Sequence, residues 1–138
     1  MATLYKSANI LIHPYRGEGF GMHIQEAMAS GCIPLVTAGG PTDEFVTDFK
    51  INSGPRSVNM YEIFALKPTD SMSQMGSHKF VLEPDVNHLV YQLKHIIDNI
   101  KSIVVDKSNL KTWDTVGDAF YKALLAIHQN GKSPRRNR

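Results

Sequence analysis

What the sequence lacks narrows the class of protein first. Its 138 residues include one cysteine, Cys32, so no intrachain disulfide can form, as is usual in a reducing compartment. No apolar run approaches the roughly 20 residues that a membrane span needs, and the N-terminus has no signal-peptide pattern. These absences predict a soluble, cytoplasmic protein. The position of Cys32 between Gly31 and Ile33 favours a small buried hydrophobe over the alternative, a reactive thiol.

An excess of charge of one sign is also missing. The formal net charge is +2, from 15 basic and 13 acidic residues, and the basic excess stands in the C-terminal segment 132–138. Without that segment acidic residues outnumber basic ones, so we expect no nucleic-acid-binding face. Segment 132–138 is predicted to be a disordered basic tail, with contact to anionic lipid head groups as a minor alternative.

Glycine, in contrast, is concentrated in one stretch, GEGFGMHIQEAMASG, which runs from Gly17 to Gly31. Three glycines at its start permit backbone conformations and close ligand approach that a Cβ would block. The apolar residues then recur at helical spacing from about Gly21, namely Ile24, Ala27 and Met28. Gly31 is suited to the left-handed residue that ends a helix.

A glycine loop that opens a helix is suited to binding an anion. The first backbone N–H groups are unpaired there and the helix dipole is positive, which favours a phosphate or a polarised oxygen. Glu26 falls on a face away from the apolar residues, and helical side chains lean toward the N-terminus, so Glu26 can reach back to the loop. Glu18 stands in the loop itself. Two carboxylates suit sugar hydroxyls better than the anion.

Two short apolar runs, at 9–12 and 33–37, flank this helix and are predicted to be parallel strands. Strand, helix and strand within about thirty residues form a βαβ unit. The glycine loop then lies at the carboxyl end of the first strand, where open α/β sheets place their ligands.

The remaining elements are predicted with less detail. A short helix is expected from Pro41 to about Val46, capped by Thr42 or Asp43, and a final strand at 79–82. Residues 48–79 are hard to interpret, with a strand or hairpin at 58–66. Two amphipathic helices follow. The first begins after Asp85 and has the inward residues Val86, Leu89, Val90, Leu93, Ile96, Ile97 and Ile100. The second is capped by Thr112, ends at 130–131, and has the inward residues Trp113, Val116, Phe120, Leu124 and Ile127.

The spacing Glu18-x7-Glu26, written EGFGMHIQE and followed by AMASGCIPLVT, resembles the signature of retaining glycosyltransferases of family 4. Further matches are His13-Pro14, Gly39-Gly40 with Glu44, and Leu82-Glu83-Pro84-Asp85. The resemblance implies part of a two-domain GT-B enzyme. Residues 1–131 would be its C-terminal nucleotide-sugar-binding domain, an N-terminally truncated α/β, Rossmann-like parallel sheet with flanking helices.

The resemblance also implies roles for single residues. Glu26 would accept hydrogen bonds from the nucleotide ribose, and Glu18 would contact the transferred sugar as the catalytic residue. The backbone of Gly19, Phe20, Gly21 and Met22 would line the sugar and diphosphate. Glu26 as an ordinary exposed carboxylate, and Glu18 as a cap of the helix start, are the alternatives. Arg16 is expected to face solvent.

No cofactor or metal is expected. The six histidines show no ligand spacing, and His13 and His23 flank the loop without an evident partner carboxylate. The Asp-x-Asp pattern of the other large glycosyltransferase architecture does not occur in the sequence. We therefore expect a metal-independent reaction with a nucleotide sugar as donor substrate.

Family members carry an acceptor domain and a diphosphate-binding arginine and lysine upstream of this region. The chain would need a missing N-terminal domain or a separate partner chain to supply them, and alone it is expected to be inactive. A complete enzyme would be a retaining hexosyltransferase-type glycosyltransferase. The alternatives are a non-catalytic nucleotide-sugar-binding or interaction module and, more remotely, sugar-nucleotide epimerisation. The donor base, sugar and acceptor are not indicated.

Overall fold

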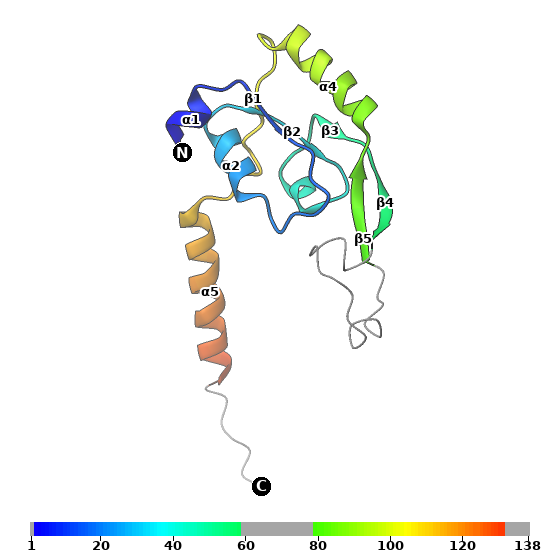
Figure 1. Ribbon diagram of the computed structural model, residues 1–138. Coiled ribbons are helices and arrows are strands. Elements are labelled where there is room, and N and C mark those ends of the chain that lie inside the picture. The colour runs from blue at the N-terminus through cyan, green and yellow to red at the C-terminus, as the bar shows by residue number, and fades with distance from the viewer. Residues whose placement is uncertain (1, 59–78, 132–138) are drawn as a thin grey trace.

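The computed structural model describes residues 2–58 and 79–131, and in this part the fold is mixed α/β (Figure 1). The predicted tail and most of the segment 58–66 lie outside the described residues. A parallel sheet has the order β1 (Ile10–His13), β2 (Ile33–Thr37) and β3 (Lys50–Ile51). A second, antiparallel sheet pairs β4 (Ser53–Val58) with β5 (Lys79–Pro84). The helices are α1 (Ala2–Lys6), α2 (Met22–Ala29), the short 3-10 helix η1 (Pro41–Glu44), α4 (Val86–Asn99) and α5 (Trp113–Gly131).

The predicted strand–helix–strand unit is confirmed as β1, α2 and β2, with β1 beginning one residue later than expected. The two strands are parallel, with Ile10 opposite Ile33 and His13 opposite Val36. Both therefore end at the same edge of the sheet. β1 ends at this edge with His13, and the glycine loop follows.

The hydrophobic core lies on both faces of β2, all five residues of which are buried. Val36 packs with Ile24 and Met28 of α2 on one face. Leu35 packs on the other face with Ile96 of α4. The sheet is thus covered by a helix on each side, the Rossmann-like arrangement that the sequence predicted (Figure 1).

The N-terminal helix is held to this core through Cys32, which is buried as expected. Its thiol donates to the carbonyl of Tyr5 at 2.9 Å and to that of Ala8 at 3.3 Å. Burial raises the pKa of the Cys32 thiol. The thiol therefore stays protonated and serves packing.

The strand predicted at 79–82 exists, but it does not join the parallel sheet that the resemblance implied. As β5 it pairs antiparallel with β4, with Arg56 opposite Val81. The partner strand comes from the segment 50–58, which has no clear apolar periodicity. Only one residue separates β3 from β4, so the chain passes directly from the parallel sheet into the antiparallel pair of β4 and β5.

The helix predicted from Pro41 is a single 3-10 turn that ends at Glu44, two residues early. Neither proposed cap bonds the start of this turn. The carboxylate of Asp43 instead accepts the N–H of Gly39 at 2.8 Å and pairs with Lys50 at 3.0 Å. The hydroxyl of Thr42 is buried and bonded elsewhere.

Asp85 caps α4 as predicted, because its carboxylate accepts the N–H groups of Asn87 at 2.8 Å and His88 at 3.1 Å. The predicted apolar stripe is right in part. Ile96 is fully buried, and Leu89, Leu93 and Ile100 pack beside it. Three stripe residues are exposed instead, Val86, Val90 and Ile97. They lie along one edge of the packed stripe, beside its buried residues.

Thr112 caps α5 as predicted, accepting the N–H of Thr115 at 3.2 Å. The expectation that the apolar residues of α5 point inward was wrong, since Trp113 is 79% and Phe120 66% exposed. The same correction applies to Val116, Leu124 and Ile127. Helical spacing predicted an apolar face, but α5 extends away from the sheet, so the described residues do not cover that face (Figure 1).

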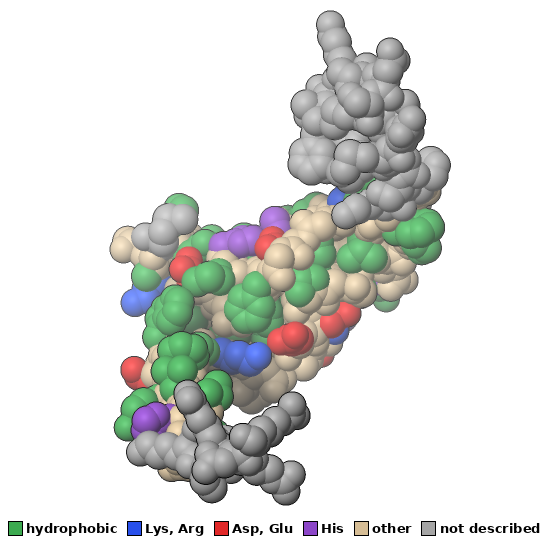
Figure 2. Space-filling view, turned by 90° about the horizontal axis from the view of Figure 1, so that it is seen from below, with side chains coloured by type: hydrophobic (Ala, Val, Ile, Leu, Met, Phe, Trp, Pro, Cys, Tyr) green, Lys and Arg blue, Asp and Glu red, His purple; other side chains and the backbone are tan. Residues whose placement is uncertain are grey.

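Hydrophobic side chains gather on the face of the molecule that includes α5, with acidic and basic ones between them (Figure 2). Among the described residues, no helix combines the length and apolarity that crossing a membrane requires.

Candidate functional site

The glycine loop joins the end of β1 to the start of α2. Gly21 is the loop position at which the structure requires glycine. Gly21 has φ +87°, and a Cβ there would lie 2.9 Å from Thr42 Cγ2 and 3.0 Å from Ile24 Cδ1. A Cβ at Gly17 or Gly19 would meet no atom within 4 Å. Glycine is thus required by the fold at Gly21, whereas the other two glycines lie open at the surface.

Tyr15, at the start of this loop, is held in place by two buried hydrogen bonds. Its phenol hydroxyl and the Thr42 hydroxyl form a buried hydrogen bond of 2.7 Å, and its carbonyl accepts from Thr37 Oγ1 at 2.8 Å. Burial raises the pKa of the Tyr15 phenol, and the bond to Thr42 only partly opposes this effect. Tyr15 is therefore a neutral anchor between β1, β2 and η1.

Arg16 ties the loop to β5. Its Nε and Nη2 each donate to the Glu83 carboxylate at 2.7 Å, and Arg56 Nη1 donates to the same carboxylate at 3.2 Å. The hydrogen bonds from Arg16 are the largest cause of a pKa of about 2 for Glu83; desolvation of the carboxylate opposes them, and Arg56 adds to the lowering. Arg16 is exposed, as predicted, but the Glu83 carboxylate holds its guanidinium in place.

Glu18 is bound within its own loop. Its Oε1 accepts the N–H of Gly19 at 2.8 Å and that of Phe20 at 3.3 Å, while Oε2 lies 3.3 Å from His13 Nε2. Burial of the carboxylate raises its pKa, but the two amides, His13 and the charge of His23 together lower it below its usual value. Glu18 is therefore ionised at neutral pH.

This geometry bears on two interpretations of the sequence. Glu18 bonds loop amides that precede α2, so it does not cap the helix, whose N-cap Gly21 makes no side-chain hydrogen bond. The amides of Gly19 and Phe20, predicted to line the donor, are already engaged by the carboxylate. A ligand at these two amides has to displace it.

His13 and His23 meet at Glu18, which corrects the expectation that the histidines do not assemble. The two rings contact edge to face with centroids 4.4 Å apart. One ligand atom from each of His13, Glu18 and His23 lies within 4.8 Å of the others. Histidine side chains lie together beside an acidic one on this face (Figure 2). Spacing along the chain gave no sign of this cluster, because a strand end, a loop and a helix supply its members.

Glu26 is exposed on α2, as predicted, and lines a groove of about 650 Å³. The wall from the loop and α2 consists of Phe20, Met22, Gln25, Glu26 and Ala29. The opposite wall comes from the segment before α5 and its first turn: Lys107, Leu110, Lys111, Thr112, Trp113 and Val116. The volume lies within the range of about 300–1,000 Å³ typical of small-molecule sites.

Phe20 and Met22 thus share the groove with Glu26, and the Phe20 ring lies 5.9 Å from that of Phe45. Glu18, Gly19 and Gly21 do not line the groove, although Glu18 bonds the backbone of Phe20. The lysines of the far wall were not predicted. Lys111 pairs with Glu44 at 3.4 Å and has its Nζ 6.0 Å from the Phe20 ring centroid.

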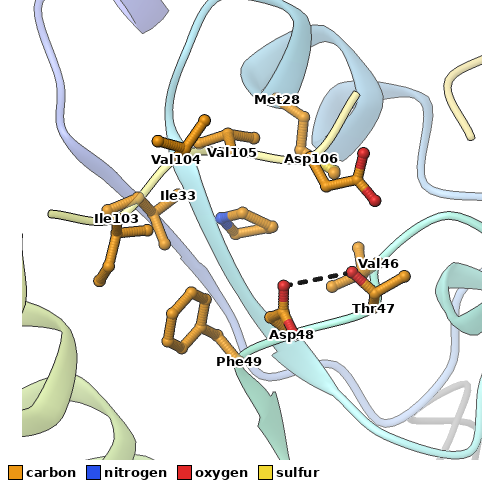
Figure 3. A pocket seen from close by; sticks show the side chains of 11 residues that line it. Met28, Ile33, Val46, Thr47, Asp48, Phe49, Ile103, Val104, Val105 and Asp106 are labelled. Atoms are coloured by element: carbon orange, nitrogen blue, oxygen red, sulfur yellow. Dashed lines mark hydrogen bonds between the residues drawn. The ribbon is translucent and has the colours of Figure 1, made fainter. Parts of the chain in front are cut away.

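A second cavity lies beneath β2 and is too small for a nucleotide (Figure 3). Its volume is about 20 Å³, roughly the space of one water molecule. Asp48 and Phe49 line it beside Val104 and Val105, and Thr47 donates to Asp48 at 3.3 Å. We therefore place the candidate site at the groove and the glycine loop.

Comparison with known proteins bears on the first part of the chain. Residues 1–58 match the family model of glycosyl transferases group 1. The matched segment runs from α1 to the end of β4 and includes the loop, Glu18 and Glu26. It supports a role in glycosyl transfer. No curated protein and no solved structure matched the chain.

Proposed function

We propose that this chain is the donor-binding part of a retaining, nucleotide-sugar-dependent glycosyltransferase of GT-B architecture. The observation that carries the proposal is the position of Glu26 in a groove of about 650 Å³ beside the signature loop. The match of residues 1–58 to group 1 glycosyl transferases supports it independently.

In this proposal the ribose lies against Glu26, since an ionised carboxylate accepts hydrogen bonds from two vicinal hydroxyls. The diphosphate lies toward the start of α2, where helix dipole and backbone N–H groups favour negative charge. Lys107 and Lys111 on the opposite wall add positive charge to the same groove. Such fixed charges stabilise the nucleotide as it leaves.

Glu18 would contact the transferred sugar as the catalytic residue. A ligand that takes the N–H groups of Gly19 and Phe20 frees one oxygen of Glu18 for sugar hydroxyls. In this proposal the Glu18 carboxylate thus changes its hydrogen-bond partners from the loop amides to the donor sugar. The acceptor site would be supplied by a further domain or a separate partner chain, and no cofactor takes part.

Saturation-transfer NMR with UDP-, GDP- and ADP-sugars tests the proposal, with Glu26→Gln as the variant. The loss of a charge-assisted hydrogen bond of about 1.5–3 kcal/mol is expected to weaken binding by at least tenfold. Asp98→Asn is the matched control, because Asp98 is exposed on α4 and is not a lining residue of the groove. Equal binding by Glu26→Gln and the parent chain would contradict the assignment of the ribose to Glu26.

A further inference from the structure

The cluster at the glycine loop has the composition of a metal site. His13 ends β1, Glu18 lies in the loop, and His23 stands in the first turn of α2. All three side chains are half-buried, and one ligand atom of each lies within 4.8 Å of the other two. Imidazole nitrogen and carboxylate oxygen are ligands that Zn²⁺ accepts together.

The spacing of these atoms fits a tetrahedral ion. Bonds of about 2.0–2.1 Å place two tetrahedral ligands about 3.4 Å apart. His13 Nε2 and Glu18 Oε2 are 3.3 Å apart, so this pair already has the required separation. The widest pair has to close by at most about 1.4 Å. Rotation of the half-exposed His23 side chain supplies a movement of that size.

The surroundings hold the ligands in place. The amides of Gly19 and Phe20 bind Glu18 Oε1, which leaves Oε2 directed at the histidines. The backbone of His13 is fixed opposite Val36 in the sheet. Hydrogen bonds to the non-ligating atoms of a carboxylate are a usual means of orienting a metal ligand.

We propose that His13, Glu18 and His23 bind Zn²⁺ or a chemically similar divalent transition metal. The three protein ligands leave the fourth tetrahedral position to water or another ligand, as in sites where zinc acts chemically. Cys32 is not part of the site, because its thiol is buried and donates to the carbonyls of Tyr5 and Ala8. The proposal does not depend on glycosyl transfer: it uses Oε2 of Glu18, whereas the proposed sugar contact uses the oxygen that the loop amides release.

The rival interpretation is a hydrogen bond between His13 and Glu18 with His23 packed against it. The two interpretations differ at His23, which is a ligand in the first and only a packing neighbour in the second. Calorimetric titration of the full chain with ZnCl₂ separates them. The variants are His13→Ala, His23→Ala and His23→Gln, with His95→Ala on α4 as the matched control.

Binding of a single Zn²⁺ is expected for the parent chain and for His95→Ala. Each variant of His13 or His23 is expected to lose at least tenfold in affinity, as loss of a metal ligand or its support does. Far-UV circular dichroism verifies that the variants fold, and His23→Gln serves where His23→Ala does not. Excess Mg²⁺, which prefers all-oxygen sites, is expected not to compete.

Three results would overturn the proposal. One is no heat of binding in the parent chain, and another is unchanged affinity in a folded His23 variant. The third is equal loss of affinity in His95→Ala, which would indicate scattered surface histidines in place of one site.

Discussion

Gly21 gives the sharpest test of the loop geometry, because both its backbone and its surroundings exclude a side chain. Its φ of +87° lies in the region that costs other residues about 1–2 kcal/mol. The Cβ of Gly21→Ala would also lie 2.9 Å from Thr42 Cγ2 and 3.0 Å from Ile24 Cδ1. Overpacking of this kind costs about 1–3 kcal/mol. We expect a total loss of about 2–5 kcal/mol in the free energy of unfolding.

Two other glycines separate the contributions. Gly31 has φ +100°, but a Cβ there meets nothing within 4 Å, so Gly31→Ala should lose only the backbone cost of about 1–2 kcal/mol. Gly17 has neither constraint, and Gly17→Ala should change stability by at most about 1 kcal/mol, in the stabilising direction.

The measurement is urea unfolding of the three variants, followed by circular dichroism at 222 nm. Trp113 fluorescence is a poor probe, since that side chain is 79% exposed. A Gly21→Ala variant that is no less stable than Gly31→Ala would refute the packing argument. A large loss in Gly17→Ala would show that the loop is more constrained than its open surroundings indicate.

Two further predictions concern the anchors of the loop. Because the pKa of Glu83 is lowered from 4.5 to about 2, its pairing with Arg16 stabilises the fold fully above the ordinary pKa. In urea titrations over a pH series, the stability difference between the parent chain and Glu83→Gln should therefore shrink as the pH falls from 4.5 towards 2, and a pH-independent difference would contradict the pairing. Thr42→Val removes the side-chain partner of the buried Tyr15 hydroxyl and should cost about 1–3 kcal/mol, whereas the double variant with Tyr15→Phe should recover most of this loss. Additive losses in that double-mutant cycle would count against the hydrogen bond.

Much of the fold was predictable where the information is local. The apolar runs around α2, the glycine after it and the Asp85 cap are each specified within a few neighbouring residues. The pairing of β5 with β4 was not predictable in this way, since β4 has little apolar alternation and its partner lies beyond a long intervening segment. For α5, helical spacing indicates which face is apolar, but the spacing carries no information on what covers that face.

In the candidate site too, the features set by neighbouring residues were predictable and the contacts between distant residues were not. The loop and the exposure of Glu26 agree with the prediction. The contacts of His13 with Glu18 and His23, and of Arg16 with Glu83, join residues from different elements. Their geometry depends on where β1, α2 and β5 lie in space, which no single stretch of sequence specifies.

The pairing of Arg16 with Glu83 means that the signature segment alone does not contain every residue that holds its loop. The two residues stand 67 positions apart, and Glu83 lies outside the matched segment 1–58. A fragment that ends at Val58 would keep every residue of the signature and lose the carboxylate that holds Arg16. The order of the loop is therefore a property of the chain well beyond its motif. Transplanting the signature into another protein would require transplanting its distant anchor as well.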